Sequence, residues 1–408
     1  MKDETKQRSD YTYKYNKKLG RHGWLRLTPA YSVKLVRELA LDTPKNSIIL
    51  DPFSGTATTG IVAAELGMNA HLFDINPFLI WLGNVKCQTF QQNEIDAIKN
   101  EVVPKILADY KDMAILNNWT PNIYNIERWW CGHTLPLISA LRTAIVNNCG
   151  MPEGVSSNNL IWVAFMRLII ETSSAAFNHV SMSFKGGVTR FEVEQIEALF
   201  LNIIENIADS AASDIIGKAE VFLCDSRNPT SQNGVTYDHV ITSPPYPNRM
   251  TYIRELRPYM YWAGFLEEAK EAGELDWKAI GGTWGTATSK LKTWTNDESN
   301  LSDELLNVVE VIANSGDKNS NLMSQYVYKY FSDMHKHFAG LRGILNTGAK
   351  LDYIIGNSSF YGNLVRAEVI MEKSLTTLGY TDVKSRIVRK RNCNKELYEF
   401  CVSAKWLG

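Results

Sequence analysis

Residues 46–77 read NSIILDPFSGTATTGIVAAELGMNAHLFDINP, and this stretch decides the fold class. The short apolar, β-branched run at 47–50 is typical of a buried parallel strand. A loop of small residues follows, then a predicted helix at 59–66 and a second apolar strand at 70–73 that ends at Asp74. This order places a polar ligand group at a helix N-terminus and a ribose against a carboxylate, so it predicts a nucleoside site. The loop has neither the Walker lysine nor the GxGxxG spacing, which argues against a P-loop and against a hydride-transfer dinucleotide site.

A second signal lies at 219–256, where two further apolar strands are predicted. The first ends at Asp225, and the second, at 238–242, runs directly into Ser-Pro-Pro-Tyr at 243–246. Each proline lacks an N–H and fixes its own φ, so the pair ends the strand abruptly and leaves a rigid loop at the carboxyl edge of the sheet. Ligands bind at that edge in doubly wound sheets. The predicted catalytic residues are therefore Ser243, Pro244, Pro245 and Tyr246.

Together, the two motifs resemble those of the DNA amino-methyltransferases, which use S-adenosylmethionine to methylate N4 of cytosine or N6 of adenine. DPFSGTATT at 51–59 is similar to their cofactor loop DPFxGxGTT, with Ala57 where a glycine is usual, and TSPPY at 242–246 is similar to their catalytic [DNS]PP[YFW] tetrapeptide. The resemblance covers residues 20–90 and 219–405. It implies an α/β fold, a doubly wound Rossmann-like methyltransferase sheet with a C-terminal antiparallel hairpin and a helical insertion.

The resemblance also implies how S-adenosylmethionine is held. It assigns Asp51, Phe53 and the Gly55 backbone to the methionine side, Asp74 to the ribose hydroxyls and Asp225 to the adenine amino group, since a strand-end carboxylate can accept such hydrogen bonds. Helix N-capping is the alternative role for the last two, because Asn-Pro follows each closely. No metal site is predicted. The complete set of predicted cofactor residues is Thr28, Pro29, Asp51, Pro52, Phe53, Ser54, Gly55, Thr58, Asp74, Ile75, Asp225 and Ser226.

The rest of the chain divides around these motifs. We predict a catalytic domain at 1–90 and 219–408, with a basic segment at 1–22. The mainly helical insertion at 91–218 is a candidate DNA-contacting subdomain. Apolar spacing of three and four predicts helices across the insertion, with Trp129 and Trp130 in its core. After the Ser-Pro-Pro-Tyr loop, the pattern predicts a long amphipathic helix at 326–350, a strand within 351–362, a helix ending near Gly379 and a terminal hairpin.

The charge balance argues against a uniformly basic DNA-binding protein. The 408 residues contain 43 Lys plus Arg and 44 Asp plus Glu, for a net charge of -1. The basic residues are nevertheless concentrated locally: residues 1–40 hold ten basic and four acidic side chains, and a second basic cluster lies at 384–391. We expect both segments to line the cleft that receives DNA.

Two segments without clear periodicity, 179–192 and 267–300, are candidates for reading the target sequence, and the sequence does not choose between them. We name 267–300 the candidate target-recognition loop. Ordinary ion pairing is the alternative role for the arginines that follow the Ser-Pro-Pro-Tyr loop. The predicted DNA-binding residues are Lys185, Arg190, Arg249, Arg254, Arg389, Lys390 and Arg391.

The implied reaction is direct methyl transfer to a base flipped out of the duplex. Tyr246 is expected to stack on the base, while the Ser243 hydroxyl and the Pro244 carbonyl accept hydrogen bonds from its amine and free the lone pair for attack. The chain has no Pro-Cys pair, which argues against cytosine-C5 chemistry. A first-position serine resembles the cytosine-N4 members, so we predict a DNA (cytosine-N4)-methyltransferase. The alternatives are an adenine-N6 enzyme, an RNA or protein amino-methyltransferase and an inactive DNA-binding relative.

The expected setting is a restriction-modification system in the cytoplasm of a bacterial or archaeal cell, with activity at the nucleoid. Its partners would be duplex DNA and a cognate restriction endonuclease encoded separately. No run of 18 apolar residues occurs, so no membrane span is predicted. Six scattered cysteines without a CxxC pair are expected to be reduced, mostly buried thiols.

Overall fold

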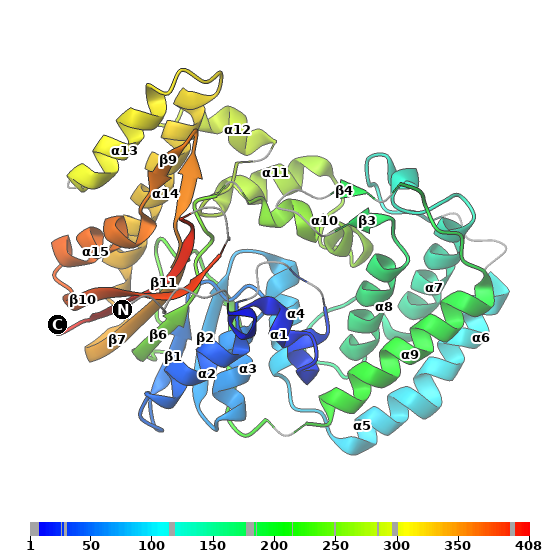
Figure 1. The fold of residues 1–408 in the computed structure, drawn as a ribbon. Coiled ribbons are helices and arrows are strands. Elements are labelled where there is room, and N and C mark those ends of the chain that lie inside the picture. The colour runs from blue at the N-terminus through cyan, green and yellow to red at the C-terminus, as the bar shows by residue number, and fades with distance from the viewer. Residues whose placement is uncertain are drawn as a thin grey trace.

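A seven-stranded sheet forms the centre of the molecule, with strand order β10-β11-β7-β6-β1-β2-β5 (Figure 1). Its strands are β1 (Ile48–Asp51), β2 (Asn69–Asp74), β5 (Ala219–Leu223), β6 (Tyr237–Thr242), β7 (Leu345–Gly356), β10 (Thr381–Lys390) and β11 (Tyr398–Lys405). The computed structural model describes residues 8–25, 27, 31–113, 119–176, 183–184, 186–213, 215–248, 250–283, 285–295, 301–391 and 396–408.

The strands from β5 to β7 run parallel, whereas β11 is antiparallel to β7 and β10 is antiparallel to β11. Parallel strands need helical crossovers and are normally covered on both faces. The apolar runs that form these strands suit such coverage, because they place apolar side chains on both faces of the sheet. The predicted doubly wound sheet with a C-terminal antiparallel hairpin is confirmed.

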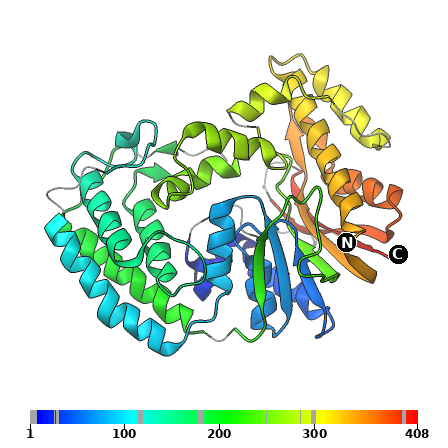
Figure 2. The ribbon, with the colours of Figure 1, turned by 180° about the vertical axis from the view of Figure 1, so that it is seen from behind.

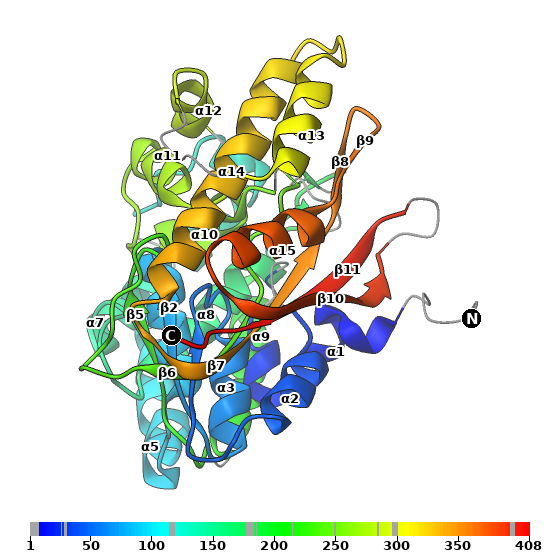
Figure 3. The ribbon, with the colours of Figure 1, turned by 90° about the vertical axis from the view of Figure 1, so that its left-hand side faces the viewer.

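Two hydrophobic cores lie on opposite faces of the sheet. Successive residues of a strand alternate between them: Ile49 belongs to the core that contains α2 (Val33–Leu41) and α3 (Thr58–Glu65), and Leu50 to the core that contains α14 (Ser320–Leu341) and α15 (Ala367–Thr377). Figure 3 shows these helix pairs on either side of the sheet. The sheet is thus fully sandwiched, which leaves its carboxyl edge for ligands.

A third core joins the helices that lie beyond the β5 edge of the sheet, as Figures 1 and 2 show from opposite sides. Trp129 and Trp130 are 4% and 0% exposed within it, so their predicted core role is confirmed. Two short strands, β3 (Ala175–Ala176) and β4 (Ser183–Phe184), pair beside these helices. The helices that contribute to the core are α4 (Pro77–Cys87), α5 (Gln92–Ala97), α6 (Val103–Met113), α7 (Thr134–Cys149), α8 (Asn159–Glu171), α9 (Val193–Ala211), α10 (Tyr252–Trp262) and α11 (Ala269–Lys278).

The expectation of an unstructured loop at 267–300 is wrong. Much of this segment forms α11 and α12 (Thr286–Leu291). The start of α11 is marked by a capping box. Glu268 is the N-cap residue, and its backbone N–H donates a hydrogen bond to the Glu271 carboxylate. A role in target recognition stays a prediction for this segment.

The helix predicted at 326–350 is wrong at both ends. α14 begins earlier, at Ser320, and ends at Leu341, and Leu345 already belongs to β7. Gly340 and Gly343 weaken helix propagation at this point, and pairing with β11, which includes Lys350 opposite Lys405, stabilises the strand instead.

The remaining elements are peripheral to the sheet. Cys87, Cys224 and Cys401 are buried free thiols. No helix in the described ranges combines the length and the apolar character that crossing a membrane requires. The peripheral elements are α1 (Tyr13–Asn16), α13 (Asp303–Ala313), β8 (Ser358–Phe360) and β9 (Asn363–Val365).

Candidate active site

A cavity of about 310 Å³ opens at the carboxyl ends of the central strands. The loops that follow β1, β2, β5 and β6 all contribute to its wall, so the two sequence motifs face the same space. This is the edge at which open α/β sheets bind ligands. The predicted residues that line the cavity are Pro52, Phe53, Gly55, Asp74, Ile75, Asp225, Ser226, Ser243, Pro244, Pro245, Tyr246, Arg389 and Arg391.

Asp51 is not on the cavity wall but behind it, fully buried. Its carboxylate accepts hydrogen bonds from the Phe53 N–H at 3.0 Å, the Thr59 hydroxyl at 2.7 Å and the Thr242 hydroxyl at 2.5 Å. Burial raises the pKa of Asp51, although these hydrogen bonds oppose the shift. The carboxylate therefore links the cofactor loop to the end of β6, directly before Ser243.

Two other predicted cofactor residues, Ser54 and Thr58, are also buried behind the wall. Ala57 adopts a left-handed conformation, with φ of 59°, but its methyl group packs in the core and not against the cavity. The methyl group has room because position 83 is a glycine, where an added Cβ would lie 3.3 Å from that of Ala57. Alanine in place of the usual glycine thus leaves the approach of a ligand unobstructed.

Lys86 of α4 contacts the cofactor loop, and the sequence analysis did not predict this role. Its ammonium group is buried and donates a hydrogen bond to the Thr56 carbonyl at 2.7 Å. Burial lowers the pKa of Lys86 to about 8. This contact fixes a carbonyl in the middle of the cofactor loop.

Asp74 lies at the end of β2 with backbone donors around its carboxylate. Oδ2 accepts from the Gly55 N–H at 3.1 Å, and Oδ1 accepts from the Asn76 N–H at 2.8 Å. The N-cap of α4 is Asn76, whose side chain accepts from Phe78, so the alternative capping role for Asp74 is wrong. Burial raises the pKa of Asp74 to about 7, against the effect of the backbone hydrogen bonds.

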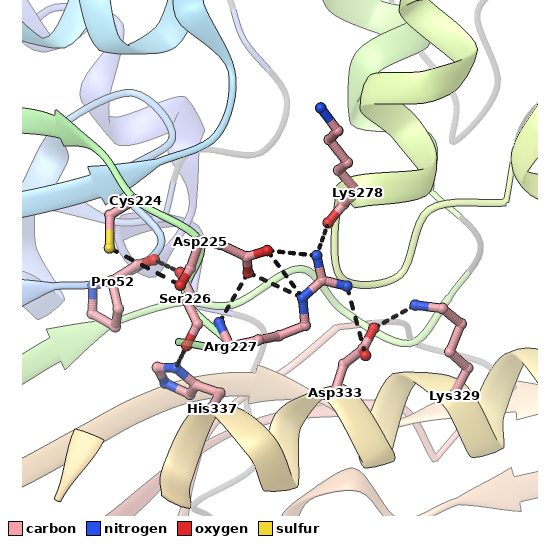
Figure 4. Close-up of polar contacts among 9 residues, drawn as sticks. All are labelled: Pro52, Cys224, Asp225, Ser226, Arg227, Lys278, Lys329, Asp333 and His337. Carbon is pink, nitrogen blue, oxygen red and sulfur yellow. Dashed lines mark hydrogen bonds and ion pairs between the residues drawn. The ribbon is translucent and has the colours of Figure 1, made fainter. Parts of the chain in front are cut away.

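Asp225 lies at the end of β5 and is paired with Arg227 (Figure 4). The Arg227 guanidinium contacts both carboxylate oxygens, at 2.6 and 3.0 Å at the closest, and also donates to the Lys278 carbonyl at 2.9 Å. Burial alone would raise the pKa of Asp225, but the hydrogen bonds and charge of Arg227 outweigh it and leave that pKa below its usual value. Because Lys278 is the last residue of α11, Arg227 also caps the negative end of that helix.

The same arginine faces α14. Arg227 lies 3.8 Å from the Asp333 carboxylate, which pairs with Lys329 at 2.5 Å (Figure 4).

Nearby, the Ser226 hydroxyl donates to the Pro52 carbonyl, and His337 Nδ1 lies 2.6 Å from the Ser226 carbonyl. Burial lowers the pKa of His337 to about 4, so the ring is neutral near pH 7 and its Nδ1–H donates to that carbonyl.

The Ser-Pro-Pro-Tyr loop is fixed from three elements. Ser243 donates its hydroxyl proton to the Ile354 carbonyl of β7 at 3.0 Å, and Tyr330 of α14 donates to the Pro245 carbonyl at 2.6 Å. The Tyr246 hydroxyl donates to Glu399 of β11 at 2.6 Å. Since the Ser243 proton is already engaged, this side chain offers the cavity its acceptor lone pairs.

Residues of both basic segments line this cavity, but among the described residues only the C-terminal segment contributes basic side chains to it. Tyr11 and Thr12 from the N-terminal segment line it together with Arg389 and Arg391, and Figure 3 shows α1 close to the β10–β11 hairpin. Part of the positive charge of the N-terminal segment is engaged elsewhere, because the Arg37 guanidinium pairs with the Glu65 carboxylate.

Three predicted DNA-binding residues in the described ranges lie off the cavity wall. Arg190 is exposed and pairs with Glu192 at 2.8 Å, Arg254 lies on α10, and Lys390 is half-buried. The predicted residues Thr28, Pro29, Lys185 and Arg249 lie outside the described residues.

Several wall residues were not singled out from the sequence. Most of them lie in segments that the sequence analysis already marked, but none was predicted there as a site residue. These additional residues include Tyr11, Thr12, Tyr31, Asn76, Asn248, Tyr252, Lys278, Ile280 and Glu399.

The residues present fit S-adenosylmethionine. The cavity combines two carboxylates at adjacent strand ends, for the ribose and the adenine amine, with exposed backbone at Gly55 and the aromatic ring of Phe53. Its volume is also within the range of small-molecule sites.

Comparisons with known proteins agree with this geometry. A family model described as DNA methylase, for N6 and N4 methyltransferases, matches residues 6–83. The type II methyltransferase M.BsoBI of Geobacillus stearothermophilus is 24% identical over 434 aligned residues, which cover 96% of this chain and 84% of the relative. The family-model match, this relative and the two motifs at one cavity support the assignment of this chain to the DNA amino-methyltransferase family.

Proposed function

We propose that this chain transfers a methyl group from S-adenosylmethionine to the exocyclic N4 of cytosine in duplex DNA. The proposal places it in a restriction-modification system beside a separately encoded endonuclease. Its support is the joint occurrence of the cofactor loop and Ser243–Tyr246 at one cavity, and the likeness to a type II methyltransferase.

The cofactor side of the cavity binds and orients S-adenosylmethionine. When bound, S-adenosylmethionine supplies a methyl group activated for transfer. Asp74 accepts hydrogen bonds from the ribose hydroxyls, and Asp225 accepts one from the adenine amine with Arg227 fixing its orientation. The Gly55 N–H donates to the Asp74 carboxylate and so aligns the cofactor loop with the group that receives the ribose hydroxyls.

The base side makes the amine a nucleophile. The lone pair of an exocyclic amine is delocalised into the ring, so hydrogen bonds that pull its protons out of the ring plane free it for reaction. Ser243 and the Pro244 carbonyl accept those bonds, while Tyr246 stacks on the flipped base.

The single observation that carries the choice of cytosine is Ser243 itself. Its hydroxyl is neutral and its proton is engaged with the Ile354 carbonyl, so an acceptor faces the amine without a negative charge near it. An aspartate there would repel the N3 lone pair of cytosine. Serine avoids that repulsion and still accepts from N4.

The test is methyl transfer to duplex DNA from labelled S-adenosylmethionine, followed by nuclease digestion. We expect 4-methylcytosine, and 6-methyladenine as the sole product would overturn the choice of base. Ser243→Ala and Tyr246→Ala should abolish transfer while S-adenosylmethionine still binds. The exposed Ser231→Ala, on a loop outside the cavity, is the matched control and should transfer at the wild-type rate.

The predicted basic residues remain proposals as DNA contacts. Arg391 is the member of the set that lines the cavity close to Tyr246, with its guanidinium carbon 5.1 Å from the ring centroid. If this set neutralises phosphates, the affinity for DNA should fall steeply with salt. The complete set is Lys185, Arg190, Arg249, Arg254, Arg389, Lys390 and Arg391.

A further inference from the structure

The ring of Tyr246 is anchored through its hydroxyl to the C-terminal hairpin. This hydroxyl donates to Glu399 Oε1 at 2.6 Å. Arg389 closes the other side of the same carboxylate, with Nε 2.8 Å from Oε2 and Nη2 3.1 Å from Oε1. The side chains of Arg389 and Glu399 are only 18% and 7% exposed, so the pair is largely removed from water.

These residues form a row across three neighbouring strands. Arg389 of β10 is the register partner of Glu399 of β11, and Glu399 is in turn the partner of Gly356 of β7. A Cβ at Gly356 would lie 2.8 Å from two carbons of the Tyr246 ring. Glycine therefore lets the ring lie directly on the strand, with its hydroxyl reaching the next strand.

A further contact braces the ring. The Arg391 guanidinium lies over the ring of Tyr246, and its Nη1 donates to the Asn357 carbonyl at 2.8 Å. Burial, and next the Glu399 carboxylate, raise the pKa of Tyr246 well above its usual value, so the phenol keeps its proton and remains the donor. The charge on Glu399 is balanced by Arg389.

We propose that Glu399 and Arg389 are positioning residues that fix the plane of the Tyr246 ring, on which the target base stacks. Arg389 then acts through Glu399 and not as a phosphate ligand. This inference rests on the proposed function, since a flipped base is what the ring would receive. A ring held in place before binding has already lost its rotational freedom, so less entropy is lost when the base stacks.

The geometry separates this role from cofactor binding. Glu399 and Arg389 come from the antiparallel hairpin at one end of the sheet, whereas Asp74 ends β2 and Asp225 follows β5 at the other end. Loss of the anchor should therefore change turnover on DNA and leave the affinity for S-adenosylmethionine nearly unchanged.

The experiment measures kcat on unmethylated bacteriophage DNA with labelled S-adenosylmethionine, and the Kd for S-adenosylmethionine by calorimetry. In Glu399→Gln we expect kcat to fall about tenfold, the usual effect of weakening one charge-assisted hydrogen bond, with the Kd within twofold of wild type. Tyr246→Phe keeps the ring and removes only the hydroxyl, so it should show the same split even if Glu399→Gln folds poorly. The double variant should lose no more than the worse single variant, because both remove one contact.

The matched control is Asp382→Asn on the same hairpin. Asp382 forms an exposed ion pair with Lys405 at 2.8 Å, and asparagine tolerates its positive φ of 51°. This variant should keep the wild-type kcat.

Two results would overturn the positioning role. One is a kcat within twofold of wild type in both Glu399→Gln and Tyr246→Phe. The other is a parallel loss of S-adenosylmethionine affinity and thermal stability, which a merely structural pair would produce. If the wild-type chain transfers no methyl group to that DNA, the proposed function fails as well, and the positioning role fails with it. An active wild type that both variants match removes only the positioning role.

Discussion

Asp74 and Asp225 occupy equivalent places in the chain but differ in chemical environment. Each follows an apolar strand, each precedes an Asn-Pro pair, and β2 and β5 lie side by side. Asp74 has backbone N–H donors and a pKa raised to about 7 by burial, whereas the Arg227 guanidinium keeps the pKa of Asp225 below its usual value. Equivalent positions in a sheet therefore need not carry the same charge, because a single cationic neighbour decides it.

The largest expected effect comes from removing Asp74, whose carboxylate forms no ion pair with the residues that the structure describes. Asp74→Ala should raise the Kd for S-adenosylmethionine about 100-fold, since two hydroxyl hydrogen bonds to a charged acceptor are worth about 3 kcal/mol. Calorimetry measures this loss, and Asp96→Ala on the exposed side of α5 is the control that should bind normally. A loss below threefold in Asp74→Ala would show that the ribose is held elsewhere.

The next effect is on pH dependence. Because the pKa of Asp74 is about 7, its carboxylate is charged above that pH and protonated below it, so affinity should weaken as the pH falls. Between pH 8 and 6 the charged fraction falls about tenfold, and the Kd for S-adenosylmethionine should rise by about the same factor. The slope should disappear in Asp74→Asn, and its persistence there would assign it to another group.

Removing Arg227 should give Asp225 a raised pKa, as Asp74 has. In Arg227→Met the cation that lowers the pKa of Asp225 is gone, and burial then raises that pKa. Lys329 and Asp333, the charged pair next to Arg227, remain paired with each other. We expect the Kd for S-adenosylmethionine to rise about fivefold at pH 7.5 and to depend more steeply on pH than in wild type. An unchanged pH slope would contradict the comparison.

The smallest effect is expected one step further along the same network. The Lys329 ammonium pairs with Asp333, which lies against Arg227 (Figure 4), and the direct effect of its charge on the pKa of Asp225 is smaller than that of Arg227. Lys329→Met should therefore change the Kd by less than twofold at pH 7.5. A change as large as that of Arg227→Met would mean that the network acts as one unit and not through Arg227.

The fold could be predicted from the sequence where local pattern and topology agree. Short apolar strands ending in Asp74, Asp225 and Ser243 are readable directly, and parallel pairing then brings those ends to one edge. The errors lie where a distant contact decides the outcome. Residues from Leu345 form β7 because β6 and β11 pair with them, and no local pattern predicts that pairing.

The same reasoning explains which parts of the site were missed. Glu399 is 153 residues away from Tyr246, and Lys86 is 30 residues away from the carbonyl it supports. Arg227 is close to Asp225 in sequence, but nothing in the sequence says which acid an arginine will contact. Side chains that orient others carry no motif, because their role depends only on where the fold brings them.

Arg21 sets an order of events for folding. Its buried guanidinium donates to the carbonyls of Lys86 and Gln88 at the end of α4 and to those of Ala211 and Ser213 at the end of α9. The latter contacts span 190 and 192 residues. While the chain is being synthesised, this charge therefore stays hydrated until more than half of the protein has emerged, and the N-terminal segment cannot be locked in place before that point.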